Sequence, residues 1–241
     1  MSIPAGLQHP PQRSFKPRRR GLSAPRLAAY ERSMERWGIT VDGDALSFVE
    51  IFGAGASGGA GNVVLDIGFG GGEALIELAE TRPHETVVGI DVHTPGIAAV
   101  LIAVEARGLR NVRVVEGDVL DFVRRIPAGS IAAIRVFFPD PWPKRRQRGR
   151  RLIRPEVVDE MVRLLRDGGS IHLATDDAGY AAQMRHVCDA HGALYGGPIP
   201  RPPWRPVTRY EQRALDEGRP AADLAYRTSD SSPNDSSSAF R

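Results

Sequence analysis

Two kinds of segment alternate along most of this 241-residue chain, and this alternation restricts the possible fold more than any other feature. Short runs rich in β-branched and apolar residues are followed by longer segments whose apolar residues have helical spacing. This order predicts a mainly parallel sheet with helices on both faces. A piece rich in glycine and proline, 196–206, interrupts the pattern. The predicted strands are 62–67, 86–91, 112–116, 131–138, 170–175 and 224–226, and the predicted helices are 24–37, 73–81, 95–107, 119–125, 155–166, 178–191 and 209–217.

The length suits one α/β domain with a substantial core and is short for two. We expect this domain to occupy residues 23–227. Residues 1–22 are rich in proline and arginine, and residues 228–241 are rich in serine. Because neither segment has a periodic apolar pattern, we expect a disordered basic arm and a disordered tail there. The glycine-rich residues 53–61 predict a flexible linker.

The composition also excludes several classes of protein. Cys188 is the only cysteine, which excludes an intrachain disulfide and a cysteine metal cluster, and we expect no metal. No apolar run approaches the length of a membrane span, and no apolar segment follows the basic N-terminus as it would in a secretory signal. We therefore expect a cytoplasmic protein that does not bind a membrane.

Positive charge is concentrated in two segments, although the net charge is only +3. Residues 1–30 carry six lysines and arginines without a carboxylate, and residues 144–154 carry seven, again without one. Concentrated basic segments in a nearly balanced chain indicate a polyanionic partner, with nucleic acid as the first choice.

The strand at 62–67 leads into a glycine-rich turn that contains Gly68 and Gly70. Glycines allow the backbone to turn tightly and to approach a ligand without a Cβ in the way. Dinucleotide enzymes use a similar turn, but here Asp66 precedes it and Glu73 stands where their last glycine would be. The charge of Asp66 would repel a pyrophosphate and attract a cofactor with a sulfonium and an amino group.

Carboxylates stand at or just after the ends of four successive predicted strands, namely Asp66, Asp91, Asp118 and Asp140. Ligands of open α/β sheets bind at this edge, where an acidic residue can hold ribose hydroxyls. Asp118 alone is equally well explained as a helix cap. Four such positions in succession favour S-adenosylmethionine, and we predict that Asp66, Gly68, Gly70, Asp91, Asp118 and Asp140 bind it.

The segment after the strand at 131–138 combines a rigid loop with a basic flank. Its sequence, Pro-Asp-Pro-Trp-Pro, excludes helix and central strand and stiffens the backbone. It is followed at once by Lys144 and the arginines of the basic segment. This arrangement would hold a polyanion close to the carboxylate of Asp140. Trp142 could stack on a base or simply fill the inside of the loop.

Five segments together resemble the bacterial tRNA (guanine-N7)-methyltransferases over about residues 24–227. They are 66–72, 89–93, 137–144, 174–176 and 205–211, and the Phe-Phe-Pro-Asp-Pro-Trp-Pro-Lys segment is the most specific of them. The resemblance implies a class I methyltransferase fold, which is a Rossmann-like, doubly wound, mostly parallel seven-stranded α/β sheet with an antiparallel last strand. It implies methyl transfer from S-adenosylmethionine to N7 of a guanosine in tRNA, at position 46 in the variable loop. The sequence departs from the family pattern at Asp66 and Asp91, where many members have Glu.

The same resemblance implies roles for individual residues. Asp140 is the implied catalytic residue. The implied substrate-binding residues are Lys144, Asp176, Thr208, Arg209, Tyr210 and Glu211, and the implied RNA-binding residues are Arg146, Arg148, Arg150 and Arg151.

Other functions remain open at this stage. The chain could be a class I methyltransferase that acts on another nucleic-acid atom or on another RNA, or an RNA-binding protein with a vestigial cofactor site. A nicotinamide dehydrogenase is disfavoured because Asp66 and Glu73 do not suit a phosphate-binding turn. A monomer and a homodimer are both compatible with the sequence.

Overall fold

The computed structural model describes residues 22–53 and 62–229. Nearly all of the predicted arm, linker and tail therefore lies outside the described residues. Within them, no helix is both long and apolar enough to cross a membrane. The helices are α1 (Ala24–Trp37), α2 (Phe48–Phe52), α3 (Glu73–Thr81), α4 (Thr94–Arg107), α5 (Val119–Phe122), α6 (Pro155–Leu164), α7 (Ala178–Asp189) and α8 (Arg209–Asp216), with two 3-10 helices, η2 (Val123–Arg125) and η3 (Arg145–Arg150).

The strands form one sheet in the order β1-β4-β3-β2-β5-β6-β8-β7. Neighbouring strands from β1 to β6 are parallel, whereas β8 runs antiparallel to both of its neighbours. The order reverses at β2, which pairs with both β3 and β5, and such a switch point leaves a crevice at the carboxyl ends of the strands. The strands are β1 (Gly38–Ile39), β2 (Val63–Ile67), β3 (Thr86–Asp91), β4 (Val112–Glu116), β5 (Ile131–Phe137), β6 (Leu165–Thr175), β7 (Leu194–Ile199) and β8 (Ala222–Thr228).

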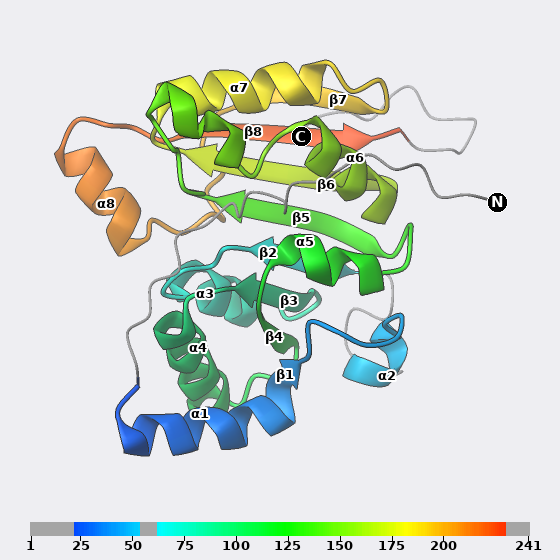
Figure 1. Ribbon diagram of the computed structural model, residues 1–241, viewed down its shortest axis with the longest axis vertical. Coiled ribbons are helices and arrows are strands. Elements are labelled where there is room, and N and C mark those ends of the chain that lie inside the picture. Colours follow the sequence, from blue (N-terminus) through cyan, green and yellow to red (C-terminus); the bar gives the residue numbers. More distant parts are fainter. Residues whose placement is uncertain (1–21, 54–61, 230–241) are drawn as a thin grey trace.

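The sheet separates two apolar layers because successive residues of a strand point to opposite faces. On one face, strand residues such as Leu65 pack against α2, α5, α6 and α7. On the other face, strand residues such as Val64 pack against α1, α3 and α4. Figure 1 shows α1, α3 and α4 over the part of the sheet formed by β2, β3 and β4. Over β5 and β6 this second face carries Arg135 and His172, and Trp204 packs on both of them.

The predicted fold is confirmed, but the predicted number of seven strands is wrong, because the described residues form eight. The additional strand β1 has two residues, which is too short to show a periodic pattern. β7 begins before the glycine- and proline-rich piece 196–206 and occupies its first residues. Gly196 is needed there, because a Cβ would lie 2.1 Å from the Ala225 carbonyl oxygen of β8. β6 also begins at Leu165, earlier than the predicted 170.

Candidate active site

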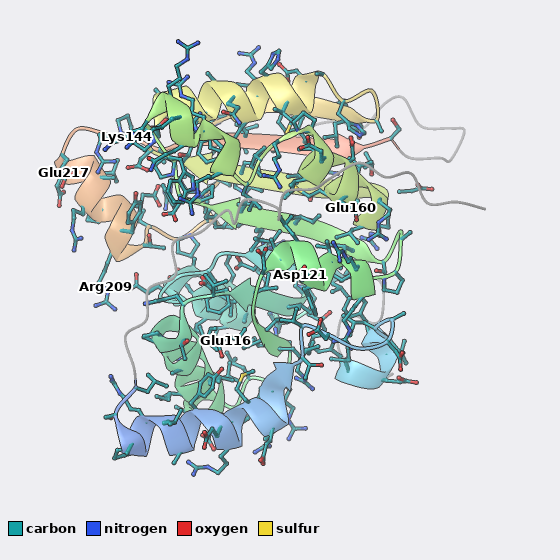
Figure 2. The ribbon with its side chains drawn as sticks, viewed as in Figure 1. Glu116, Asp121, Lys144, Glu160, Arg209 and Glu217 are labelled. Atoms are coloured by element: carbon teal, nitrogen blue, oxygen red, sulfur yellow. The ribbon has the colours of Figure 1, made fainter. Side chains whose placement is uncertain are left out.

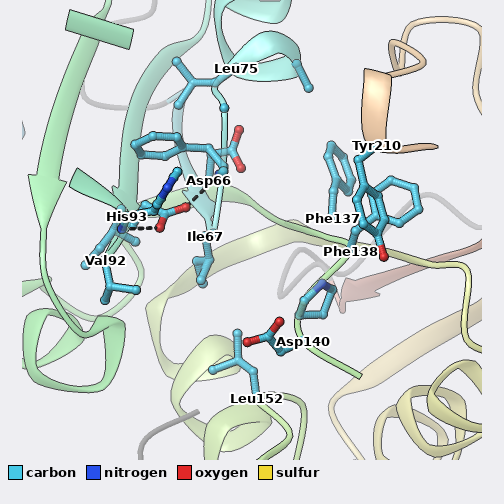
Figure 3. A pocket seen from close by; sticks show the side chains of 18 of the residues that line it. Asp66, Ile67, Leu75, Val92, His93, Phe137, Phe138, Asp140, Leu152 and Tyr210 are labelled. Carbon is cyan, nitrogen blue, oxygen red and sulfur yellow. Dashed lines mark hydrogen bonds between the residues drawn. The ribbon is translucent and has the colours of Figure 1, made fainter. Parts of the chain in front are cut away.

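A cavity of about 490 Å³ lies at the carboxyl ends of β2, β3, β4 and β5, where the strand order reverses. This volume is within the range of small-molecule sites. Figure 3 shows Asp66 and Asp140 on different sides of the cavity, with Phe137, Phe138 and Tyr210 forming an aromatic wall. The cavity brings together nine of the residues predicted from the sequence, Asp66, Gly68, Gly70, Asp91, Asp118, Asp140, Thr208, Arg209 and Tyr210.

The glycine-rich turn forms one side of the cavity and is held by Asp91. Gly68 and Gly70 have φ values of 74° and 58°, in the left-handed region that favours glycine. The Gly70 amide donates to Asp91 Oδ2 at 2.7 Å, and the His93 amide donates to Asp91 Oδ1 at 2.8 Å. Burial raises the pKa of Asp91, and these amides oppose that shift. The carboxylate keeps a further lone pair for a ligand hydroxyl.

Asp66 is the most deeply buried carboxylate that lines the cavity. It is 3% exposed, and burial raises its pKa to about 6. Arg135 on the neighbouring strand lowers this pKa, and Asp91 raises it. An ionised carboxylate in this position is costly unless a cation compensates for the lost water. The environment of Asp66 therefore favours a positively charged ligand.

Asp118 performs the structural role that the sequence left open and also lines the cavity. Its Oδ1 accepts from the Leu120 amide at 3.0 Å and so caps α5. The side chain is only half-buried, and it lies at the wall of the cavity. Asp118 can therefore cap the helix and contact a ligand with its other oxygen.

Asp140 differs from the other carboxylates of the cavity because it is exposed. Phe138 and Trp142 flank it with φ values of 54° and 42°, and they are the two non-glycine residues with positive φ in the described part of the chain. Such strained backbone is concentrated at functional sites.

The interior of the proline loop is filled by Trp142, which is 3% exposed. The Arg150 guanidinium carbon lies 3.9 Å from the centre of its ring. Trp142 therefore fills the loop, and this burial argues against the alternative that it stacks on a base. Arg151 supports the same loop, donating to the Pro141 carbonyl at 2.7 Å and to Gln183 Oε1 at 2.8 Å.

The predicted RNA-binding arginines thus divide into two groups. Arg151 is 2% exposed, and its internal hydrogen bonds argue against the predicted RNA contact. Arg150 is half-buried against Trp142. Arg146 and Arg148 are exposed on η3, beside the equally exposed Lys144. Lys144 does not line the cavity, and Figure 2 shows it near the end of the molecule that carries α8.

The segment that leads into α8 forms the remaining side of the cavity. Thr208 caps α8 by accepting from the Glu211 amide at 3.2 Å. The Arg209 amide donates to Glu73 Oε2 at 2.9 Å, and the Arg209 side chain also pairs with Glu73. This contact lowers the pKa of Glu73. Glu73 is not among the predicted site residues, although it stands where a dinucleotide-binding turn would have its last glycine.

Glu211 does not line the cavity, and its predicted role in substrate binding stays a prediction. It is 1% exposed and forms two 2.7 Å hydrogen bonds with the buried Arg205. Arg205 also donates to Asp223 Oδ1 at 2.7 Å, and Asp223 in turn contacts His172 at 2.8 Å. Glu211 therefore anchors α8 to the sheet. No local pattern predicts Arg205 as its partner, because the contact depends on the fold of the loop before α8.

Asp176 also lies outside the cavity lining, directly after β6. Tyr210 donates to its Oδ1 at 3.3 Å, and Arg219 forms an ion pair with its Oδ2. The Asp176 side chain is 5% exposed. Asp176 is thus connected to the cavity through Tyr210, which lines it, and its role in substrate binding stays a prediction.

Comparisons with known proteins agree with this geometry. A sequence model of the family described as "Putative methyltransferase" matches residues 60–224. A protein of Streptomyces avermitilis named tRNA (guanine-N(7)-)-methyltransferase is 42% identical over 221 residues, which cover 89% of this chain and 74% of that protein. A protein of Nitrosospira multiformis with the same name is 39% identical over 223 residues, covering 91% of this chain and 95% of that protein.

A solved structure shows the same fold. The 16S rRNA methyltransferase KamB aligns with a TM-score of 0.50 and 20% sequence identity, covering 70% of this chain and 88% of that one. This likeness concerns the fold alone, which is that of the class I methyltransferases. The match of the family model and the identity to the curated relatives extend over most of the chain. The chain therefore belongs to the tRNA (guanine-N(7)-)-methyltransferase family.

Proposed function

We propose that this protein transfers a methyl group from S-adenosylmethionine to N7 of a guanosine in tRNA, at position 46 in the variable loop, and so forms 7-methylguanosine. The observation that carries the proposal is the cavity at the switch point of the sheet, where carboxylates from four neighbouring strands meet beside a basic surface. Membership of the tRNA (guanine-N(7)-)-methyltransferase family supports the choice of the reaction and of the RNA.

The residues of the cavity fit S-adenosylmethionine. A Cβ at Gly68, Gly70 or Gly71 would meet no atom within 4 Å, so these backbones border open space. Asp66 suits a positively charged group, because a buried carboxylate gains from a neighbouring cation. Asp91 can accept ribose hydroxyls, as acidic residues at this strand end commonly do, and Asp118 can accept from the adenine amine. When bound, this cofactor supplies a methyl group on a positively charged sulfur.

The chemistry demands orientation more than acid–base catalysis. Guanine N7 has an available lone pair in the plane of the ring, so no proton has to be removed before it attacks. Holding the reacting atoms in line can contribute about 7–11 kcal/mol in well-oriented reactions. The exposed carboxylate of Asp140 can accept from the guanine N1–H and N2 amine, or from the ammonium group of the cofactor. Either contact would fix the geometry and favour positive charge on the base.

The RNA would reach the cavity across the basic surface of η3. Lys144, Arg146 and Arg148 are exposed there, next to the loop that holds Asp140. These side chains can contact phosphates, and the affinity for tRNA should therefore fall steeply with salt. The target guanine has to leave its stacked position to enter the cavity, as other buried bases do before chemistry. The aromatic wall of Phe138 and Tyr210 offers a surface against which it can pack.

Methyl transfer from labelled S-adenosylmethionine to unmethylated tRNA, followed by nucleoside digestion, tests the proposal. We expect 7-methylguanosine, and its loss when the variable-loop guanosine is replaced. Asp140→Ala should greatly reduce turnover, whereas Asp159→Asn is the matched control because Asp159 is an exposed carboxylate on α6. A different methylated nucleoside would overturn the assigned target. Tight RNA binding without cofactor binding would instead support a non-catalytic RNA-binding protein.

A further inference from the structure

A buried arginine, Arg135, neighbours Asp66, the most deeply buried carboxylate of the cavity. Asp66 of β2 and Arg135 of β5 are register partners in neighbouring parallel strands. Their side chains therefore project from the same face of the sheet, and parallel neighbours are about 4.8 Å apart. Arg135 is 3% exposed. An arginine within an otherwise apolar strand is unusual, because a buried charge is costly unless it is paired.

Arg135 belongs to a row of alternating charges that runs from the surface toward the cavity. Arg82 Nε contacts Glu85 Oε1 at 2.6 Å, and Glu85 Oε2 contacts Arg135 Nη2 at 2.6 Å. Arg135 is the register partner of Asp66 and lowers its pKa, whereas Asp91 at the end of β3 raises that pKa. The row thus ends at the cavity on two carboxylates in succession. A positively charged ligand would complete the alternation.

The surroundings of Arg135 preserve its charge effect on Asp66. The guanidinium carbons of Arg82 and Arg135 each lie 5.3 Å from the centre of the Trp204 ring, which covers both. An apolar ring at this position excludes water, and charges act over longer distances where water is excluded. Arg135 Nη1 is buried and has no hydrogen-bond partner among the described residues. The guanidinium is therefore not fully used in structural hydrogen bonds.

We propose that Arg135 is a positioning residue for cofactor binding, whose fixed positive charge keeps the neighbouring Asp66 carboxylate ionised and able to hold a cationic ligand. This inference rests on the proposed function, because it takes S-adenosylmethionine as that ligand. The direction of the effect agrees with the pKa of Asp66, which burial raises to about 6 and Arg135 lowers. The other titratable groups that line the cavity are Glu73, Asp91, His93, Asp118, Asp140, Arg209 and Tyr210.

The test is the affinity for S-adenosylmethionine, measured by calorimetry between about pH 5 and pH 9. In the unaltered protein, affinity should fall as the pH drops through about 6, because Asp66 becomes protonated. The variant is Arg135→Gln combined with Glu85→Gln, so that Glu85 is not left as a buried carboxylate without its arginine partner. We expect the midpoint of the fall to move upward by about one pH unit, with affinity at pH 7 reduced about twofold and restored at high pH.

Three further variants make the result decisive. Arg135→Lys keeps the charge and should restore a midpoint close to that of the unaltered protein. Arg113→Gln is the matched control, because Arg113 is also a strand arginine but donates to backbone carbonyls, and its midpoint should not move. Asp66→Asn should remove the pH dependence near 6.

Two outcomes would overturn the inference while leaving the proposed function intact. One is an equal loss of affinity at every pH in the Arg135 and Glu85 double variant, which would indicate a merely structural role. The other is an unchanged pH dependence in Asp66→Asn, which would assign the titration to another group. If the unaltered protein bound no S-adenosylmethionine at any pH, the proposed function itself would fail, and this inference with it.

Discussion

Replacing Gly96 by alanine should weaken cofactor binding although the residue does not line the cavity. Gly96 is the third residue of α4, and a Cβ there would lie 1.9 Å from the carbonyl oxygen of Gly70. Ordinary van der Waals contact begins at 3.4 Å, so the turn that contains Gly70 has to move away by about 1.5 Å. The perturbation therefore acts on the glycine-rich turn.

The size of the effect follows from the hydrogen bond that this turn makes. The Gly70 amide donates to Asp91 at 2.7 Å, and a shift of about 1.5 Å in that backbone would break the bond. A hydrogen bond to a charged group contributes about 1.5–3 kcal/mol, and overpacking costs about 1–3 kcal/mol. The better helix propensity of alanine returns up to about 1 kcal/mol. The clash outweighs this gain, and we expect the dissociation constant for S-adenosylmethionine to rise at least about tenfold.

Calorimetric titration of the cofactor, together with thermal unfolding of the ligand-free protein, would measure both consequences. Gly179→Ala is the matched control, since Gly179 is also near the start of a helix and a Cβ there would be in ordinary contact, at 3.4 Å, with Asp177. The control should bind the cofactor normally and be slightly more stable. The reasoning would be refuted if Gly96→Ala bound the cofactor as tightly as the unaltered protein.

Three other variants test separate parts of the structure. The pKa of Asp66 is about 6 in the folded protein and 3.8 ordinarily, so the folded protein binds more protons and loses stability as the pH rises through this window. Asp66→Asn should therefore increase the free energy of unfolding of the ligand-free protein at neutral pH by up to about 3 kcal/mol, seen as a higher melting temperature. The same variant should reduce cofactor affinity. Arg151→Met should lower the free energy of unfolding in urea by about 3 kcal/mol because it removes buried hydrogen bonds. Arg148→Met, at an exposed position, should leave stability unchanged and lower the salt dependence of tRNA binding. Glu211→Ala should cost about 3–5 kcal/mol because it leaves the buried Arg205 poorly paired, with the exposed Glu217→Ala as its control, and a loss below about 1 kcal/mol would contradict the anchoring role.

The cofactor side of the site was predictable from the sequence because its information is local. Parallel strands end at the same edge of a sheet, so a carboxylate at each strand end predicts that the carboxylates meet. The strand pattern alone predicts that three carboxylates lie close together, and the cavity is indeed lined by Asp66, Asp91 and Asp118. The glycine-rich turn was predictable in the same way, because glycine adopts the positive φ found at Gly68 and Gly70 without strain.

The substrate side was harder to predict because it depends on contacts between distant segments. The motif that contains Glu211 indicates function, but its burial results from Arg205 and Asp223, which belong to a loop and to β8. Arg151 looks like its basic neighbours in the sequence, yet its contact with Gln183 of α7 takes it out of the surface. The neighbour relation of Asp66 and Arg135 requires the register of β2 and β5, which no local pattern specifies.

The cavity carboxylates differ in exposure, and this difference suggests a division of labour. Asp91 and Asp118 each accept backbone amides, and Asp66 is fixed by burial, so the cofactor side is organised before any ligand arrives. Asp140 is exposed, and its loop has strained backbone on both sides. A preorganised site lowers the cost of binding, whereas an exposed group in a strained loop can adjust to the ligand that enters last. Under the proposed function, we therefore expect the sheet to bind the cofactor and the proline loop to position the base.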